Sequence, residues 1–293
     1  MSRALITLLL AAACLAPRLA SADKNPFAAG AKSGTFRTSD GVRLHYFEAG
    51  KGRAIVFVPG WTVPAWMWDP QIRYFAKDYH VIALDPRSQG ESERPTEGNH
   101  LERRAQDIKE LVEKLKLAPA ILVGHSLAAR ELLSYVDQFG TGTLAGVVLV
   151  DHAIGPFPKP EEAASFHALL RQVGTNRREL LGRMIPNFFK KPLPTGYKER
   201  LIEDAMKTPS NTALALIAGS MGTDFKPKLP GMRIPVLYAI TPQYRDDGEW
   251  VKTNVPGAKV EMFENAGHVL FMDEQDRFNA LVDEFARSSF RAP

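Results

Sequence analysis

The sequence predicts an α/β protein in which a mostly parallel central sheet is flanked by helices. Short apolar runs, typical of strands buried on both faces, recur along the chain and alternate with helical patterns. These runs cover residues 54–58, 79–84, 120–123, 146–150 and 235–240, and the alternation at 41–50 is typical of an exposed antiparallel strand. The clearest helical pattern, at residues 101–115, places its apolar side chains on one face of a helix.

The alternation of strands and helices stops between residues 152 and 232, which have no convincing strand pattern. Amphipathic helices fit this region instead, at residues 160–173, 177–189, 197–207 and 211–221. Because long loops without structure are uncommon in compact domains, we expect residues 152–232 to form an inserted helical cap. The sheet domain would then consist of residues 23–151 and 233–293.

The first 22 residues have the features of a secretory signal peptide. Arg3 supplies a positive charge, residues 4–13 form an apolar run, and residues 20–22 are Ala-Ser-Ala, an A-x-A cleavage site. The apolar run is shorter than the ~20 residues that a membrane-spanning helix needs. We therefore expect an exported protein, periplasmic or secreted, whose mature chain begins at Asp23.

The single cysteine, Cys14, lies within this leader. Residues 10–14 loosely resemble a lipoprotein cleavage box, so a lipid anchor at Cys14 is an alternative, although the leucine stands one position too early. Cleavage at the predicted signal site would leave a mature chain without cysteine. Its hydrophobic core, and not disulfides, would then hold the fold together.

The composition argues against a nucleic-acid-binding protein. The chain has 37 Lys and Arg against 33 Asp and Glu, and Arg3 and Arg18 belong to the leader. The other basic residues are scattered, which suits a solvated surface better than a phosphate-binding stripe. The sequence has no metal-ligand cluster, phosphate-binding glycine-rich loop or dinucleotide fingerprint, so we expect no cofactor. Nothing in it indicates an obligatory protein partner.

The most informative segment is residues 121–129, where Ser126 stands between an apolar strand and a helical pattern. A serine in a sharp strand-to-helix turn needs small residues two positions before and after it, and Gly124 and Ala128 meet this need. Such a turn would expose the Ser126 hydroxyl and direct the amide of Leu127 toward a bound carbonyl. The alternative is that Ser126 is only a helix N-cap.

In this context the sequence resembles the α/β-hydrolase family over about residues 35–290. The shared motifs occur in the family's order: Pro59-Gly60-Trp61, then residues 85–92, the Ser126 turn, and residues 265–268. The segment 59–71 is similar to the subset of esterases and cofactor-free haloperoxidases. The resemblance implies an α/β-hydrolase fold and points to serine hydrolase chemistry, with the 85–92 segment bracing a loop beside the site.

A serine nucleophile needs a base, and His268 is the best candidate because it follows Ser126 in a Gly-containing loop near the end of the chain. The third member is less clear, since Gln243 occupies the place where most of the family has an acid. Asp151, which ends the 146–150 strand, is preferred because geometry and not chain order defines a triad. Asp246 and Asp247, just beyond Gln243, remain alternatives.

The family's oxyanion hole maps onto backbone amides, those of Leu127 and Trp61. Gly60 would let its loop approach the substrate closely, and we assign Gly60 and His125 to substrate contact. His45 falls in the strand expected to be exposed, and no catalytic role is assigned to His152. We expect Trp61 to face the substrate.

Together these features predict an exported serine hydrolase that cleaves small-molecule carboxylic esters through a Ser-His-Asp acyl-enzyme mechanism. Lactone hydrolysis, perhydrolysis and carbon–carbon bond hydrolysis are alternatives that use the same groups. A non-catalytic ligand-binding protein on the same fold is a further alternative, because Gln243 stands where an acid is usual.

Overall fold

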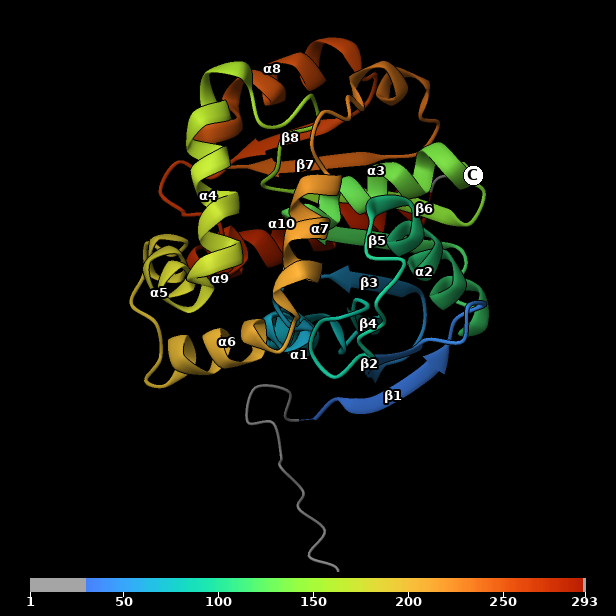
Figure 1. Cartoon of the computed structure of the whole chain (residues 1–293). Helices are drawn as coiled ribbons and strands as arrows, with labels where there is room; N and C mark the ends of the chain where they lie inside the picture. The colour runs from blue at the N-terminus through green and yellow to red at the C-terminus, as the bar shows by residue number, and fades with distance from the viewer. Residues whose placement is uncertain (1–29, 292–293) are drawn as a thin grey trace, which may run out of the picture.

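A computed structural model describes residues 30–291 and contains one eight-stranded sheet with the order β1-β2-β4-β3-β5-β6-β7-β8 (Figure 1). The strands are β1 Lys32–Arg37, β2 Arg43–Gly50, β3 Ala54–Val58, β4 His80–Asp85, β5 Ala120–His125, β6 Leu144–Val150, β7 Val236–Ile240 and β8 Lys259–Met262. The strand β2 pairs antiparallel with β1 and β4, and all other neighbours are parallel. The predicted mostly parallel sheet is therefore confirmed. The predicted signal peptide and Cys14 lie outside the described residues.

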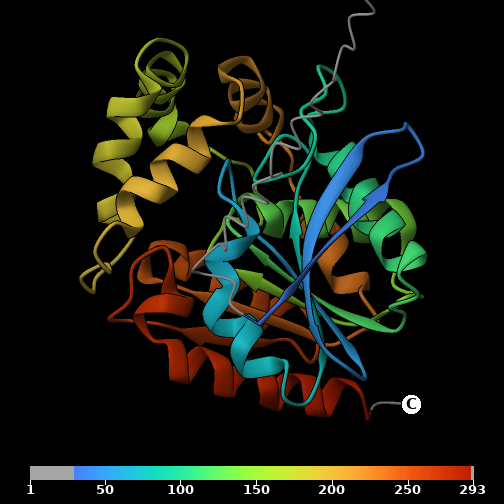
Figure 2. The ribbon, with the colours of Figure 1, turned by 90° about the horizontal axis from the view of Figure 1, so that it is seen from below.

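Helices cover both faces of this sheet (Figures 1 and 2). The sheet domain contains α1 Asp69–Phe75, α2 Leu101–Lys114, α3 Leu127–Phe139, α8 Arg245–Asn254, α9 Leu270–Asp273 and α10 Gln275–Ser289, with short 3-10 helices at Ala65–Trp68 and Pro242–Tyr244. Side chains of α1 and α10 share one apolar cluster with Ile55 and Phe57, whereas α2, α3 and α8 share another with Val56. Successive residues of β3 therefore face opposite layers, which explains why the strand is apolar throughout.

The helical insertion, residues 152–232, lies beyond the carboxyl ends of the parallel strands (Figures 1 and 2). It contains α4 Ala163–Thr175, α5 Arg177–Asn187, α6 Tyr197–Met206 and α7 Ser210–Gly219, flanked by 3-10 helices at Pro160–Glu162 and Lys226–Gly231. Val173, Leu180 and Ala213 form a small core of its own. Its role as a cap stays a prediction. None of the helices within residues 30–291 is long and apolar enough to span a membrane.

The antiparallel strand expected at residues 41–50 is present as β2, but the expectation that it is exposed is wrong. In the structure β2 is paired on both edges, and the side chain of His45 is buried, with only 4% of the residue exposed. The His45 Nδ1–H donates to Asp85 Oδ2 at 2.7 Å, and its Nε2 lies 2.7 Å from the Ser33 hydroxyl. The polar residue that suggested a solvent-facing side is therefore a hydrogen-bonded residue inside the sheet domain. β1 was not predicted.

One buried arginine fastens both ends of the helical insertion to the sheet domain. Arg130 lies on α3, four residues after Ser126, and has no exposed surface. Its guanidinium donates to the carbonyls of Ala153 and Gly155 at 3.0 and 2.9 Å and to those of Ser220 and Thr223 at 3.0 and 2.7 Å. The four carbonyls come from the beginning and the end of the insertion, so one side chain holds its two connections together.

Replacing Arg130 with methionine should lower the free energy of unfolding by about 3 kcal/mol, because methionine fills much of the volume but leaves buried carbonyls without donors. Urea denaturation measures this change. Arg178→Met is the control, since Arg178 is an exposed partner of Glu203. If Arg130→Met were as stable as the control variant, the hydrogen bonds of Arg130 to the two ends of the insertion would not contribute to stability as expected.

A second consequence of the packing concerns His152, which is buried against the aromatic rings of Tyr244 and Phe157, at centroid distances of 6.1 and 5.1 Å. Burial, reinforced by the positive charge of Arg130, lowers the pKa of His152 to about 3. In the unfolded chain this imidazole therefore binds a proton below pH ~6.5, whereas in the folded chain it stays neutral until the pH falls to about 3. The contribution of the neutral His152 to the free energy of unfolding is fully present above pH ~6.5 and is lost as the pH decreases from about 6.5 to about 3.

Replacing His152 with glutamine should remove this contribution. Between pH 6 and pH 4 we expect the slope of unfolding free energy against pH to become shallower by about 1.4 kcal/mol per pH unit. Denaturant titrations across this range test the expectation. His167→Gln, at an exposed position of α4, should keep the wild-type slope. An unchanged slope in His152→Gln would show that the histidine is not kept neutral by the fold.

Candidate active site

Ser126 occupies a strained turn between β5, which ends at His125, and α3, which begins at Leu127. Its backbone has φ 55° and ψ −125°, a conformation that L residues rarely adopt. An added Cβ at Gly124 would lie 2.7 Å from the carbonyl oxygen of Ala128, so the return of the chain past β5 requires glycine there. The strand-turn-helix context predicted for Ser126 is present.

The structure brings Ser126, His268 and Asp151 into one hydrogen-bonded chain. The Ser126 hydroxyl lies 2.9 Å from His268 Nε2, and His268 Nδ1 lies 2.7 Å from Asp151 Oδ2. The backbone N–H of Thr241 donates to the other carboxylate oxygen of Asp151 at 2.6 Å. The Asp151 side chain is fully buried, whereas 19% of the His268 side chain is exposed. The arrangement can remove a proton from the hydroxyl and stabilise the imidazolium that forms.

The neighbouring strands explain how residues distant in sequence meet. Ser126 follows β5 and Asp151 follows the adjacent β6, while His268 lies in the loop after β8. The carboxyl ends of parallel strands share one edge of the sheet, where loops collect functional groups. Asp151 also has a positive φ of 52°, which fits its sharp exit from β6 toward the site.

The two alternative acids lie elsewhere, in the first turn of α8. Asp247 pairs with Lys226 at 2.8 Å and accepts a bond from the amide of Ile154 at 3.3 Å. The Asp246 side chain is 86% exposed and lies 3.5 Å from Lys159. Of the three candidate carboxylates, the structure thus places only Asp151 against His268.

The Gly60 loop passes directly beside the serine. A Cβ added at Gly60 would lie 2.9 Å from Ser126 Cβ, so glycine permits this close approach. The N–H of Leu127 belongs to the first turn of α3, whose first amides have no acceptor within the helix. The indole N–H of the half-buried Trp61 donates to the carbonyl of Ala213 on α7 at 2.8 Å, so it joins the loop to the helical insertion.

A buried glutamine that the sequence did not single out holds this loop. Gln89 Nε2 donates to the carbonyls of Gly60 and Val63 at 2.9 and 2.7 Å. The 85–92 segment, expected to brace the loop, does so in part through this side chain. The sequence does not reveal such a role for a loop amide, because its acceptors are backbone atoms of residues that lie 29 and 26 positions earlier.

His125 does not have the exposure expected of a substrate-binding side chain. It is buried, with its ring against Trp68 and Phe271 at centroid distances of 6.3 and 5.1 Å. Its Nε2–H donates to the carbonyl of His268 at 2.9 Å. The geometry fits support of the His268 loop better than contact with a substrate. Burial also lowers the pKa of His125 well below its usual value, which keeps the ring neutral.

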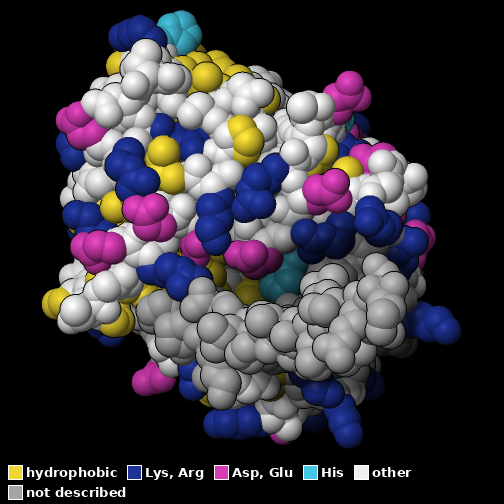
Figure 3. Space-filling model, turned by 60° about the horizontal axis from the view of Figure 1, so that its bottom comes forward, with side chains coloured by type: hydrophobic (Ala, Val, Ile, Leu, Met, Phe, Trp, Pro, Cys, Tyr) yellow, Lys and Arg dark blue, Asp and Glu magenta, His cyan; other side chains and the backbone are white. Residues whose placement is uncertain are grey.

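An aromatic side chain of the helical insertion lies beside His268. The half-buried ring of Phe188, which follows α5, lies 5.1 Å from the ring of His268. In the sheet domain, the aromatic residue Trp61 directly follows Gly60, the residue that approaches Ser126. Figure 3 shows basic and acidic side chains intermingled on the face that it draws, without a single-sign stripe.

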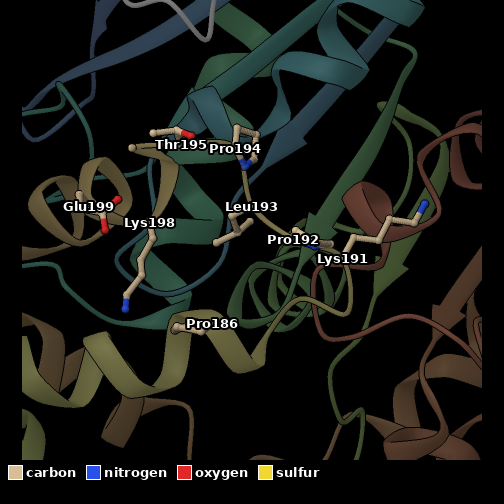
Figure 4. Close-up of a pocket in the computed structure, with 9 residues that line it drawn as sticks. Pro186, Lys191, Pro192, Leu193, Pro194, Thr195, Lys198 and Glu199 are labelled. Carbon is tan, nitrogen blue, oxygen red and sulfur yellow. The ribbon is translucent and has the colours of Figure 1, made fainter.

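A surface hollow of about 700 Å³ lies apart from these residues, between α5 and α6 (Figure 4). Its lining comes from the end of α5, the linker and the beginning of α6, namely Pro186, Lys191, Pro192, Leu193, Pro194, Thr195, Gly196, Lys198 and Glu199. None of the three hydrogen-bonded residues lines it.

Comparisons with known proteins identify the family to which the chain is related. A non-heme chloroperoxidase of Streptomyces lividans is 30% identical over 222 residues, which cover 70% of this chain and 80% of that protein. Another, from Kitasatospora aureofaciens, is 28% identical over 272 residues, covering 85% and 97%. An esterase structure from Exiguobacterium antarcticum has a TM-score of 0.79 at 22% identity, covering 86% of this chain and 98% of that one.

An enol-lactonase structure from Burkholderia xenovorans has the same fold, with a TM-score of 0.74 at 20% identity over 87% of this chain and all of that one. At these identities the solved structures show the fold alone. The sequence model of the alpha/beta hydrolase family matches residues 55–281, a segment that includes Ser126, Asp151 and His268. The chain therefore belongs to the alpha/beta hydrolase family.

Proposed function

We propose that this protein is an exported serine hydrolase that cleaves uncharged carboxylic esters through an acyl-enzyme. The observation that carries the proposal is the hydrogen-bonded chain Ser126–His268–Asp151, with distances of 2.9 and 2.7 Å. The glycine loop beside the serine supplies the second part of an acyl-transfer site. Export rests on the composition of residues 1–22, which have a charged start, an apolar run and a small-residue cleavage site.

The reaction begins when His268 Nε2 takes the Ser126 proton while the serine oxygen attacks the ester carbonyl. Asp151 accepts the Nδ1–H bond and stabilises the imidazolium. The backbone amides of Leu127 and Trp61 donate to the oxyanion of the tetrahedral intermediate. His268 then gives its proton to the leaving alcohol, and the acyl group stays on Ser126.

Water completes the cycle. His268 accepts a proton from a water molecule as the water oxygen attacks the acyl-enzyme, and the carboxylic acid leaves when the serine oxygen recovers the proton. Hydrogen peroxide attacking the same acyl-enzyme would give a peracid, so perhydrolysis is the second candidate function. A bifunctional esterase/perhydrolase of Acinetobacter calcoaceticus, 33% identical over 40% of this chain, favours testing both.

The preference for uncharged esters rests on the surroundings of the site. The half-buried ring of Phe188 lies 5.1 Å from the ring of His268, and Trp61 directly follows Gly60 in the loop beside Ser126. In this proposal the helical insertion, which lies beyond the carboxyl ends of the strands, acts as a cap. Such surfaces favour aromatic or medium-length acyl groups by burying apolar area. Carboxylated or phosphorylated esters would lack a cation among these residues.

Replacing Ser126 with alanine should abolish labelling by a fluorophosphonate and lower turnover of p-nitrophenyl esters by at least about 10³-fold, because no other group can carry the acyl intermediate. Ser134→Ala is the matched control, since Ser134 is a buried serine on the same helix α3. Peracid formation from acetic acid and hydrogen peroxide is measured in parallel. Ester turnover that persists in Ser126→Ala, or a wild-type protein that neither turns over esters nor reacts with the label, would refute the proposal.

A further inference from the structure

Asp273 is a buried carboxylate that no step of the proposed reaction uses. It ends α9, only 1% of the residue is exposed, and the hydrogen bonds that it accepts come from backbone amides. Gly267 N lies 2.8 Å from Oδ2, Lys190 N lies 3.1 and 2.9 Å from the two oxygens, and Lys191 N lies 3.0 Å from Oδ1. Bonds between an ionised carboxylate and amides are among the stronger hydrogen bonds in proteins.

These amides belong to two segments far apart in the sequence. Gly267 immediately precedes His268, whereas Lys190 and Lys191 lie in the linker between α5 and α6 of the helical insertion. In Figure 4 this linker runs beside α5 and α6, with Lys191 at the edge of the surface hollow. One carboxylate thus joins the insertion to the residue next to the proposed base.

The same two segments meet on the other side of His268. The Val269 N–H donates to the carbonyl of Phe188 at 3.0 Å, and the Phe188 ring lies 5.1 Å from the His268 ring. A Cβ added at Gly267 would lie 2.4 Å from the Phe188 carbonyl oxygen, so this contact requires glycine. Residues 267–269 are therefore held against residues 188–191 both before and after His268.

We infer that Asp273 is a positioning residue that makes the alignment of His268 with Ser126 depend on the helical insertion. The inference rests on the proposed function of His268 as the base. Displacing a reacting group by about 1 Å can cost roughly 10²-fold in rate. Any movement of the 188–191 linker that breaks the bonds to Asp273 would thus reduce proton transfer without removing a reacting group.

Asp273→Asn tests the inference, because the amide keeps the size of the side chain but loses one acceptor oxygen and the negative charge. We expect kcat for p-nitrophenyl acetate to fall about 10- to 100-fold while KM changes less than about twofold. The rate of fluorophosphonate labelling should fall in parallel. The Nδ1–H resonance of His268 in proton NMR should shift or broaden, a change that simple loss of stability would not produce in the folded protein.

Asp204→Asn is the matched control. Asp204 is also buried and also joins the insertion to the sheet domain, since it accepts a bond from the indole of Trp66 at 2.6 Å. Its contact is not made with residues 267–269, so kcat and the Nδ1–H resonance should stay near wild-type values. Gly267→Ala offers a second route, because its added Cβ would collide with the Phe188 carbonyl, whereas it would lie 3.3 Å from Asp273 Oδ2 and keep the carboxyl group. It should reproduce the loss in kcat even where Asp273→Asn does not fold.

Wild-type kcat in Asp273→Asn, or in Gly267→Ala, would overturn the inference. Equal losses in Asp273→Asn and Asp204→Asn would overturn it as well, since the effect would then belong to any loosening of the insertion. The failure of the proposed function would look different. In that case the wild-type protein itself would neither turn over esters nor react with the label. The dependence of His268 on Asp273 would still be visible, because the Nδ1–H resonance would respond to Asp273→Asn and not to Asp204→Asn.

Discussion

The hydrogen bond between His268 Nδ1 and Asp151 Oδ2, at 2.7 Å, is the contact on which the site depends. It joins the loop after β8 to the residue that ends β6, and it fixes which nitrogen of the imidazole faces Ser126. Asp151 can make this bond because its backbone turns sharply, with φ 52°, and because the Thr241 amide holds its second oxygen. A fully buried carboxylate in this setting has a defined orientation before any substrate arrives.

Close packing at the carboxyl edge of the sheet brings the other groups to the same place. Glycine at position 60 lets its loop approach Ser126, and glycine at position 124 lets α3 return past β5. Gln89 holds the Gly60 loop by hydrogen bonds to two of its carbonyls. The helical insertion is part of this arrangement. It is tied to the sheet domain by Arg130 at its two ends and by Asp273 beside His268. The site is therefore built by both parts of the chain.

The sequence was sufficient to predict the parallel sheet and the Ser126 turn, because buried strands and a strand-turn-helix serine leave local patterns. The sequence did not determine whether Asp151, Asp246 or Asp247 is the acid that contacts His268, because chain order does not determine which loop reaches a histidine. The structure also showed features without a local signal. Gln89 and Asp273 bind backbone atoms of segments that are distant in the sequence. His45 is buried because its imidazole forms a hydrogen bond with Asp85 on β4.

The identity of the acid tests the account most directly, because it separates this geometry from the usual position of the acid in the family. Asp151→Asn should lower kcat for a p-nitrophenyl ester by about 10⁴-fold, since the amide no longer stabilises the imidazolium or the required tautomer. Asp247→Asn, which changes a buried carboxylate paired with Lys226, should keep kcat within a few-fold of wild type. Near-normal kcat in Asp151→Asn together with a large loss in Asp247→Asn would contradict the account.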